Sequence, residues 1–145
     1  MTGTDLLLAI HLLGAVIWVG GMFFALLVLR PALAAIDPAA RLALLVEVLR
    51  RFLGIVWVAM PVMVVTGYAM VFAAFGGFGA VPWSVNVMNL LGLVMAVVFV
   101  WMFFGPWRRF RAAPAPDTLA PVRRLIHVNL GLGLITVVIA AFGQL

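Results

Sequence analysis

Residues 6–29 read LLLAIHLLGAVIWVGGMFFALLVL, a stretch without any Asp, Glu, Lys or Arg. An α-helix rises ~1.5 Å per residue, so a run of this length is enough to cross a hydrocarbon core of ~30 Å. Three more uncharged stretches follow, Phe52–Phe75, Trp83–Trp107 and Leu125–Leu145. The sequence therefore predicts an all-α protein, a four-span antiparallel transmembrane helix bundle that forms a single domain over residues 1–145.

The composition excludes most other classes of protein. Hydrophobic residues make up 68% of the chain and charged residues 9%, with a mean hydropathy of +1.32, so a soluble domain with a polar surface cannot form. The absence of cysteine excludes disulfides and thiolate metal sites. The net charge of +5 comes from arginines that all lie outside the apolar runs. We interpret this charge as a topology signal and predict no nucleic-acid partner.

The arginines predict how the chain crosses the membrane. The first and third loops carry all nine of them, whereas the middle loop, residues 76–82, carries no charge. By the positive-inside rule, the arginine-bearing loops are cytoplasmic and both termini face outward. We therefore expect a multi-pass protein of a bacterial-type inner membrane, in contact with the lipid bilayer.

The second helix is predicted to begin well before its membrane part. Asp37 followed by Pro38 is typical of a helix N-cap and first helical position. Glu47 can then pair with Arg50 or Arg51 at helical spacing. This pattern predicts a cytoplasmic extension of the second helix.

His11 is the residue that distinguishes this chain from a generic bundle. An imidazole inside a membrane span is energetically costly and is a functional-site hypothesis by default. Gly14 and Trp18 follow it at spacings of three and four, which places all three on one helical face. We predict that this face binds a cofactor or metal ion near the outer side of the membrane, although a hydrogen-bonded structural histidine is the alternative.

Several polar and sulfur-containing residues are predicted at the same depth as His11. The second helix runs outward and the third runs inward. Three residues of the second helix are therefore predicted to lie level with three of the third, Thr66, Tyr68 and Met70 with Asn86, Met88 and Asn89. Imidazole and thioether groups suit Cu(I), so His11, Met88 and Met70 are the candidate metal ligands. Asn86, Asn89 and Tyr68 are candidate second-layer groups that orient the imidazole. Methionines at helical spacing also serve ordinary packing.

Copper and haem b both remain open as the cofactor, because a histidine and a methionine can also ligate haem iron. The second histidine, His127, does not help to decide. It is predicted near the cytoplasmic end of the fourth helix, ~20 Å from His11 along the bundle axis. We therefore expect His127 to be an interfacial residue near the headgroups, and a ligand at a second site is the alternative.

No catalytic residue can be assigned from the sequence. The four carboxylates have terminal, capping or ion-pair positions, and the one serine, Ser84, begins a helix. These features do not support hydrolytic chemistry. Whether the protein is an enzyme stays open; if it is one, a haem-dependent oxidoreductase is expected.

Two segments resemble a known family. His11 followed by Trp18-Val-Gly-Gly-Met-Phe-Phe24 and Leu29-Arg-Pro31 looks like the first helix of the copper-resistance protein D family. Arg123-Arg-Leu-Ile-His-Val-Asn-Leu-Gly-Leu-Gly133 looks like the closing helix of its small members. The resemblance implies an inner-membrane protein of copper uptake or handling.

A more distant resemblance is to the HemJ-type protoporphyrinogen oxidases. The resemblance implies a histidine on the first helix and a lysine on the third helix around a b-type haem. Of these two residues, only the histidine has a counterpart in this chain, His11. The third helix begins Trp83-Ser-Val-Asn-Val-Met-Asn89, and the chain contains no lysine. This chain therefore lacks the lysine that the oxidase family requires as its second group.

Three functions follow from these observations. The leading hypothesis is copper handling through a metal centre at His11 near the periplasmic face. The alternatives are a b-type haem protein, HemJ-like or in quinone-linked electron transfer, and a structural accessory subunit of a membrane complex. A homodimer or a larger membrane complex is compatible with all three.

Overall fold

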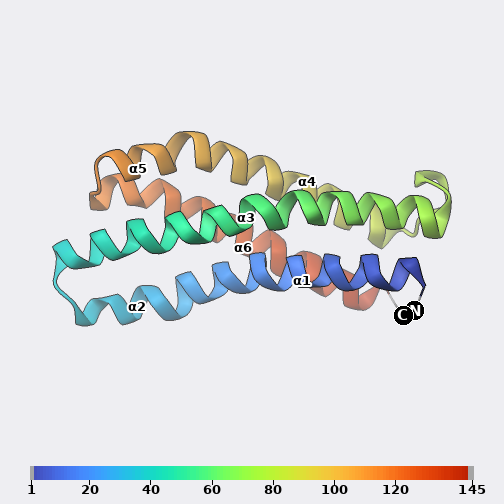
Figure 1. The fold of residues 1–145 in the computed structure, drawn as a ribbon, viewed down its shortest axis with the longest axis horizontal. Coiled ribbons are helices and arrows are strands. Elements are labelled where there is room, and N and C mark those ends of the chain that lie inside the picture. The colour runs from blue at the N-terminus through green and yellow to red at the C-terminus, as the bar shows by residue number, and fades with distance from the viewer. Residues whose placement is uncertain (1, 144–145) are drawn as a thin grey trace.

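Four helical stretches make up the computed structural model, which describes residues 2–143. They run over Gly3–Ala35, Pro38–Phe75, Trp83–Ala112 and Pro116–Phe142, and each is long and apolar enough to cross a membrane. Figure 1 shows them side by side and alternating in direction. The all-α class and the four spans are confirmed, except that residues 144–145 of the predicted fourth span lie outside the described residues.

The first and third stretches are each interrupted by a π-helical turn, over Ala25–Leu29 and over Phe103–Trp107. A short 3₁₀ turn, Phe78–Ala80, lies in the connection between the second and third stretches. The α-helical elements are α1 (Gly3–Phe24), α2 (Arg30–Ala32), α3 (Pro38–Phe75), α4 (Trp83–Met102), α5 (Arg108–Ala112) and α6 (Pro116–Phe142).

The start of α3 follows the predicted capping signal. The Asp37 carboxylate accepts a hydrogen bond from the backbone N–H of Ala40 at 2.9 Å, and Pro38 is the first helical residue. Glu47 forms ion pairs with Arg50 at 2.8 Å and Arg51 at 2.6 Å, as its spacing predicted. The helix ends at Gly76, whose φ of 68° suits a residue without a side chain.

The helices associate as two pairs. α1 packs along α3 and α4 along α6, and α1 also contacts α6 across the pairs. Between the pairs lies an apolar core, in which the Trp18 ring of α1 meets the Phe99 ring of α4 edge to face at a centroid distance of 6.0 Å. Many large apolar side chains point outward instead, as expected of surfaces in contact with lipid.

Glycines allow the helices to approach closely. A Cβ atom at Gly14 would lie 2.5 Å from the Met63 Cγ on α3, and one at Gly133 of α6 would lie 2.8 Å from a Val19 methyl on α1. Small residues at helix contacts give this kind of packing in membranes. Gly14 of α1 and Gly133 of α6 therefore lie directly against neighbouring helices.

The glycine contact between α6 and α1 can be tested with a matched pair of variants. Gly133→Leu is expected to lower the free energy of unfolding by about 1–3 kcal/mol, because the new side chain overlaps Val19 and Met95. Gly131→Leu is the control, since a Cβ there meets nothing within 4 Å. Thermal unfolding followed by tryptophan fluorescence measures both, and equal stability of the two variants would contradict this packing.

Candidate functional site

His11 lies on the face of α1 that points into the bundle. Gly14, Trp18 and Met22 follow it on the same face and are buried, while His11 itself is partly buried. The site is near the end of the bundle where the chain begins, and α2 and α5 mark the opposite end (Figure 1). His11 therefore lies within a membrane-spanning helix, and protein covers one side of it.

The hydrogen bonds of His11 determine which nitrogen of the imidazole ring carries the proton. Nδ1 lies 3.0 Å from the backbone oxygen of Met63 and 3.1 Å from the hydroxyl oxygen of Thr66, both on α3. A carbonyl oxygen can only accept, so Nδ1 carries the proton and donates it. The Thr66 hydroxyl donates to the Val62 oxygen at 2.7 Å and can accept from Nδ1 at the same time. Nε2 of a neutral imidazole is then left with a free lone pair.

Gly67 makes room for the imidazole ring. A Cβ atom at Gly67 would lie 3.2 Å from Cε1 and 3.6 Å from Nδ1 of His11. These are the ring atoms of His11 that lie closest to Gly67. The close approach of α3 thus holds the ring in place.

Met63 contacts the same region through its side chain as well as its backbone. A Cβ atom at Gly14 would lie 3.2 Å from the Met63 sulfur, and Gly14 is about one helical turn from His11 along α1. Met63 was not predicted from the sequence as the partner of the imidazole. The signal was present in the spacing of Met63, Thr66, Gly67 and Met70, which share one face of α3.

Of the predicted ligands and orienting groups, Met70 and Tyr68 belong to α3, whereas Asn86, Met88 and Asn89 belong to α4. Met70 is partly buried and follows Thr66 by about one turn of α3. On α4, Met88 and Asn89 are partly buried, and Asn86 is exposed. The amide nitrogen of Asn89 is buried without a hydrogen-bond partner among the described residues. A polar group inside the bundle with no partner is available to orient a ligand.

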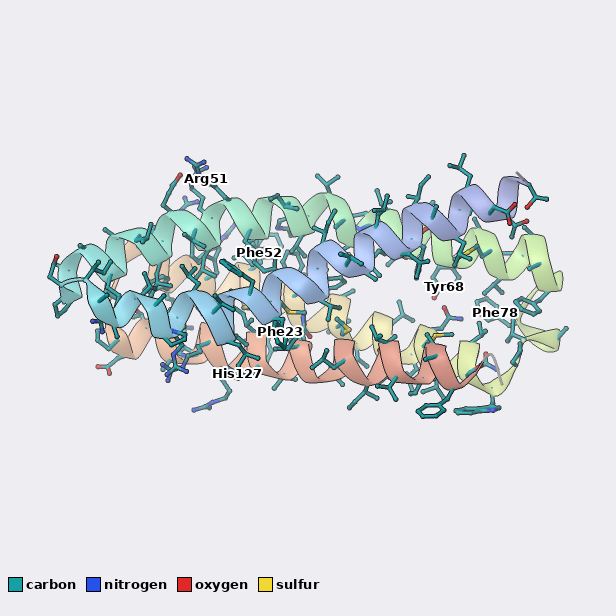
Figure 2. The ribbon with its side chains drawn as sticks, turned by 90° about the horizontal axis from the view of Figure 1, so that it is seen from below. Phe23, Arg51, Phe52, Tyr68, Phe78 and His127 are labelled. Carbon is teal, nitrogen blue, oxygen red and sulfur yellow. The ribbon has the colours of Figure 1, made fainter. Side chains whose placement is uncertain are left out.

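Tyr68 belongs to a different contact. Its ring packs edge to face against Phe78 at a centroid distance of 5.7 Å, and Figure 2 shows the two side chains together at the turn between α3 and α4. This aromatic pair lies towards the same end of the bundle as His11. The structure therefore gives Tyr68 a packing contact at this turn, and its orienting role stays a prediction.

His127 lies on α6 in the half of the bundle that contains α2 and α5. It is exposed, its Nδ1 donates to the Arg123 oxygen at 2.8 Å, and Figure 2 shows it pointing away from the bundle. Over residues 2–143, no group of three or more His, Asp or Glu side chains comes together. A metal ion bound at His11 would therefore need thioether, amide or backbone ligands.

Comparison with known proteins identifies the family. No curated protein and no solved structure matches this chain. The family model of copper resistance protein D matches residues 46–142, which cover most of α3 and the whole of α4 and α6. The match includes the closing-helix residues 123–133 and leaves out α1, so the first-helix part of the resemblance lies outside it. Because two thirds of the chain matches, this membrane protein belongs to the copper resistance protein D family.

Proposed function

We propose that this protein handles copper in the membrane and binds it through Nε2 of His11. The observation that carries the proposal is the pair of contacts from Nδ1 to the Met63 carbonyl and the Thr66 hydroxyl. A histidine that ligates a metal typically donates its other N–H in this way, which fixes the tautomer and the ring orientation. Membership of the copper resistance protein D family supports copper as the cargo.

The groups around His11 suit Cu(I). Thioether sulfur and neutral imidazole are soft ligands for this ion, and they bring no additional charge into the membrane. We propose Met70 from α3 and Met88 from α4 as the sulfur ligands. Asn86, Asn89 and Tyr68 would then help to orient the ligands, while Gly14 and Trp18 form the wall on α1.

We also propose that copper leaves the site along methionines in the interior of the helix bundle. Met63 is partly buried beside Gly14, and Met95 and Met102 are buried on α4 in the direction of the arginine-rich end. Copper captured at the outer face would pass from His11 along these thioethers. Neither haem b nor an accessory-subunit role gains support from the family match, which refers to copper resistance.

The first prediction concerns the tautomer of His11. In protein labelled with ¹⁵N-histidine and carrying His127→Ala, the one remaining imidazole should show a protonated Nδ1 and an unprotonated Nε2 at neutral pH. The cause is the Met63 carbonyl, which can only accept. Nitrogen NMR distinguishes the two tautomers, and a protonated Nε2 would contradict the proposed ligand.

The second prediction concerns copper binding by the purified chain. His11→Ala should abolish high-affinity Cu(I) binding, and Met70→Leu or Met88→Leu should weaken it by ~10-fold or more, because each removes a proposed ligand. Titration against a chromogenic Cu(I) chelator measures the affinity.

Two variants serve as controls for the copper titration. His127→Ala removes the exposed histidine, and Met22→Leu replaces a buried core methionine that is not a proposed ligand. Both should bind Cu(I) as the wild type does. Wild-type affinity in His11→Ala would refute the proposed site.

The third prediction concerns orientation, which we propose to be N-out and C-out in an inner membrane with the arginine-rich loops in the cytoplasm. The chain lacks cysteine, so single cysteines report their own accessibility. Gly79→Cys in the α3–α4 connection should react with a membrane-impermeant maleimide on intact spheroplasts. Ala113→Cys, exposed between α5 and α6, should react only after lysis. The reverse pattern of labelling would show that the chain has the opposite orientation in the membrane.

A further inference from the structure

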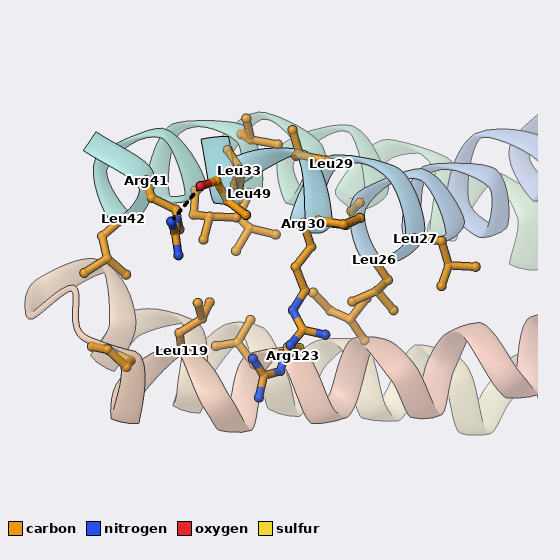
Figure 3. A pocket seen from close by; sticks show the side chains of 18 of the residues that line it. Leu26, Leu27, Leu29, Arg30, Leu33, Arg41, Leu42, Leu49, Leu119 and Arg123 are labelled. Carbon is orange, nitrogen blue, oxygen red and sulfur yellow. Dashed lines mark hydrogen bonds between the residues drawn. The ribbon is translucent and has the colours of Figure 1, made fainter. Parts of the chain in front are cut away.

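A groove of about 700 Å³ lies at the end of the bundle opposite His11. Its walls come from the end of the first helical stretch, the beginning of α3 and the beginning of α6 (Figure 3). It shares no residue with the His11 site. The copper proposal therefore does not account for it.

The groove combines an apolar wall with three positive charges. Its polar side chains are Arg30, Arg41 and Arg123, and no carboxylate among residues 2–143 lines it. The wall is rich in leucine, with contributions from all three helical segments: Leu26, Leu27, Leu29, Leu33, Leu42, Leu45, Leu49 and Leu119. An occupant must therefore be both anionic and apolar.

The three guanidinium groups have no acidic partner in the structure. Within residues 2–143, the ion pairs join Glu47 to Arg50 and Arg51 and involve none of the groove arginines. Figure 3 shows the Arg30 side chain extending from its wall towards α6, which carries Arg123. Two like charges close together are unfavourable, and a bound anion would reduce that repulsion.

Arg41 is held in place with donor capacity left over. Its Nη2 donates to the backbone oxygen of Ile36 at 3.0 Å and reaches that of Ala34 at 3.5 Å. Its Nε is buried and has no hydrogen-bond partner among the described residues. Guanidinium groups with free donors are suited to phosphate oxygens.

The position of the groove identifies the source of the anion. The arginines lie at the ends of membrane-crossing helices, where lipid headgroups are found, and Leu27 at the edge of the groove is 54% exposed. A soluble phosphate compound would make no use of the leucine wall. We propose that this groove binds an anionic phospholipid, with the headgroup phosphate on Arg30, Arg41 and Arg123 and an acyl chain along the leucines.

The proposal is tested with the full-length chain in a neutral detergent. Native mass spectrometry with phosphatidylglycerol should show a bound lipid, and phosphatidylcholine with the same acyl chains should bind far more weakly. Inorganic phosphate at the same concentration should not displace the lipid, because it cannot occupy the apolar wall. Equal binding of the two lipids, or full displacement by inorganic phosphate, would overturn the proposal.

Matched variants locate the binding to the groove. The triple variant R30Q/R41Q/R123Q should bind phosphatidylglycerol about 100-fold more weakly, since each basic side chain near an anionic lipid contributes roughly fivefold. The triple variant R109Q/R111Q/R124Q removes the same charge from exposed arginines outside the groove and should bind as the wild type does.

The outcome of these variants can contradict the proposal even if the triple variant does not fold. The single variant Arg123→Gln should by itself reduce binding roughly fivefold. An equal loss in the groove variant and the exposed variant would show general attraction to positive charge and would overturn the proposed site. Wild-type binding in Arg123→Gln would do the same.

Discussion

The hydrogen bond from His11 Nδ1 to the Met63 carbonyl joins α1 to α3, and the proposed chemistry depends on it. In the interior of a membrane, polar groups must find their partners within the protein. The carbonyl accepts the imidazole proton, and the Thr66 hydroxyl adds a second acceptor. The contact requires α3 to approach α1 closely, which glycines at positions 14 and 67 permit. Helix packing, imidazole orientation and the free lone pair on Nε2 are therefore parts of one arrangement.

The two ends of the bundle have opposite chemistry. One end contains the His11 imidazole, and the segments of α3 and α4 at that end carry methionines and asparagines but no charged side chain. The other end carries the arginines and an apolar groove whose positive charge is uncompensated within residues 2–143. A soft cation suits the first and an anionic amphiphile suits the second. The proposed copper site and the proposed lipid site can therefore function independently.

Hydropathy was sufficient to predict the fold because each span is long, uncharged and separated from the next by loops. Local signals also predicted the Asp37 cap and the Glu47 ion pairs, since both depend on neighbours within one helical turn. The partner of His11 was not predicted, because nearly uniform hydropathy does not determine how α3 is rotated about its axis. The arginine groove depends on three segments far apart in sequence, so neither its volume nor its unpartnered Arg41 Nε could be anticipated.

X-ray absorption at the copper edge of the Cu(I)-loaded protein tests the central claim most directly, since it reports the atoms bound to the metal. The account predicts an imidazole scattering pattern together with sulfur neighbours. The imidazole pattern should disappear in His11→Ala and persist in His127→Ala. A copper ion without an imidazole ligand in the wild type, or one whose imidazole signal survives the loss of His11, would contradict the account.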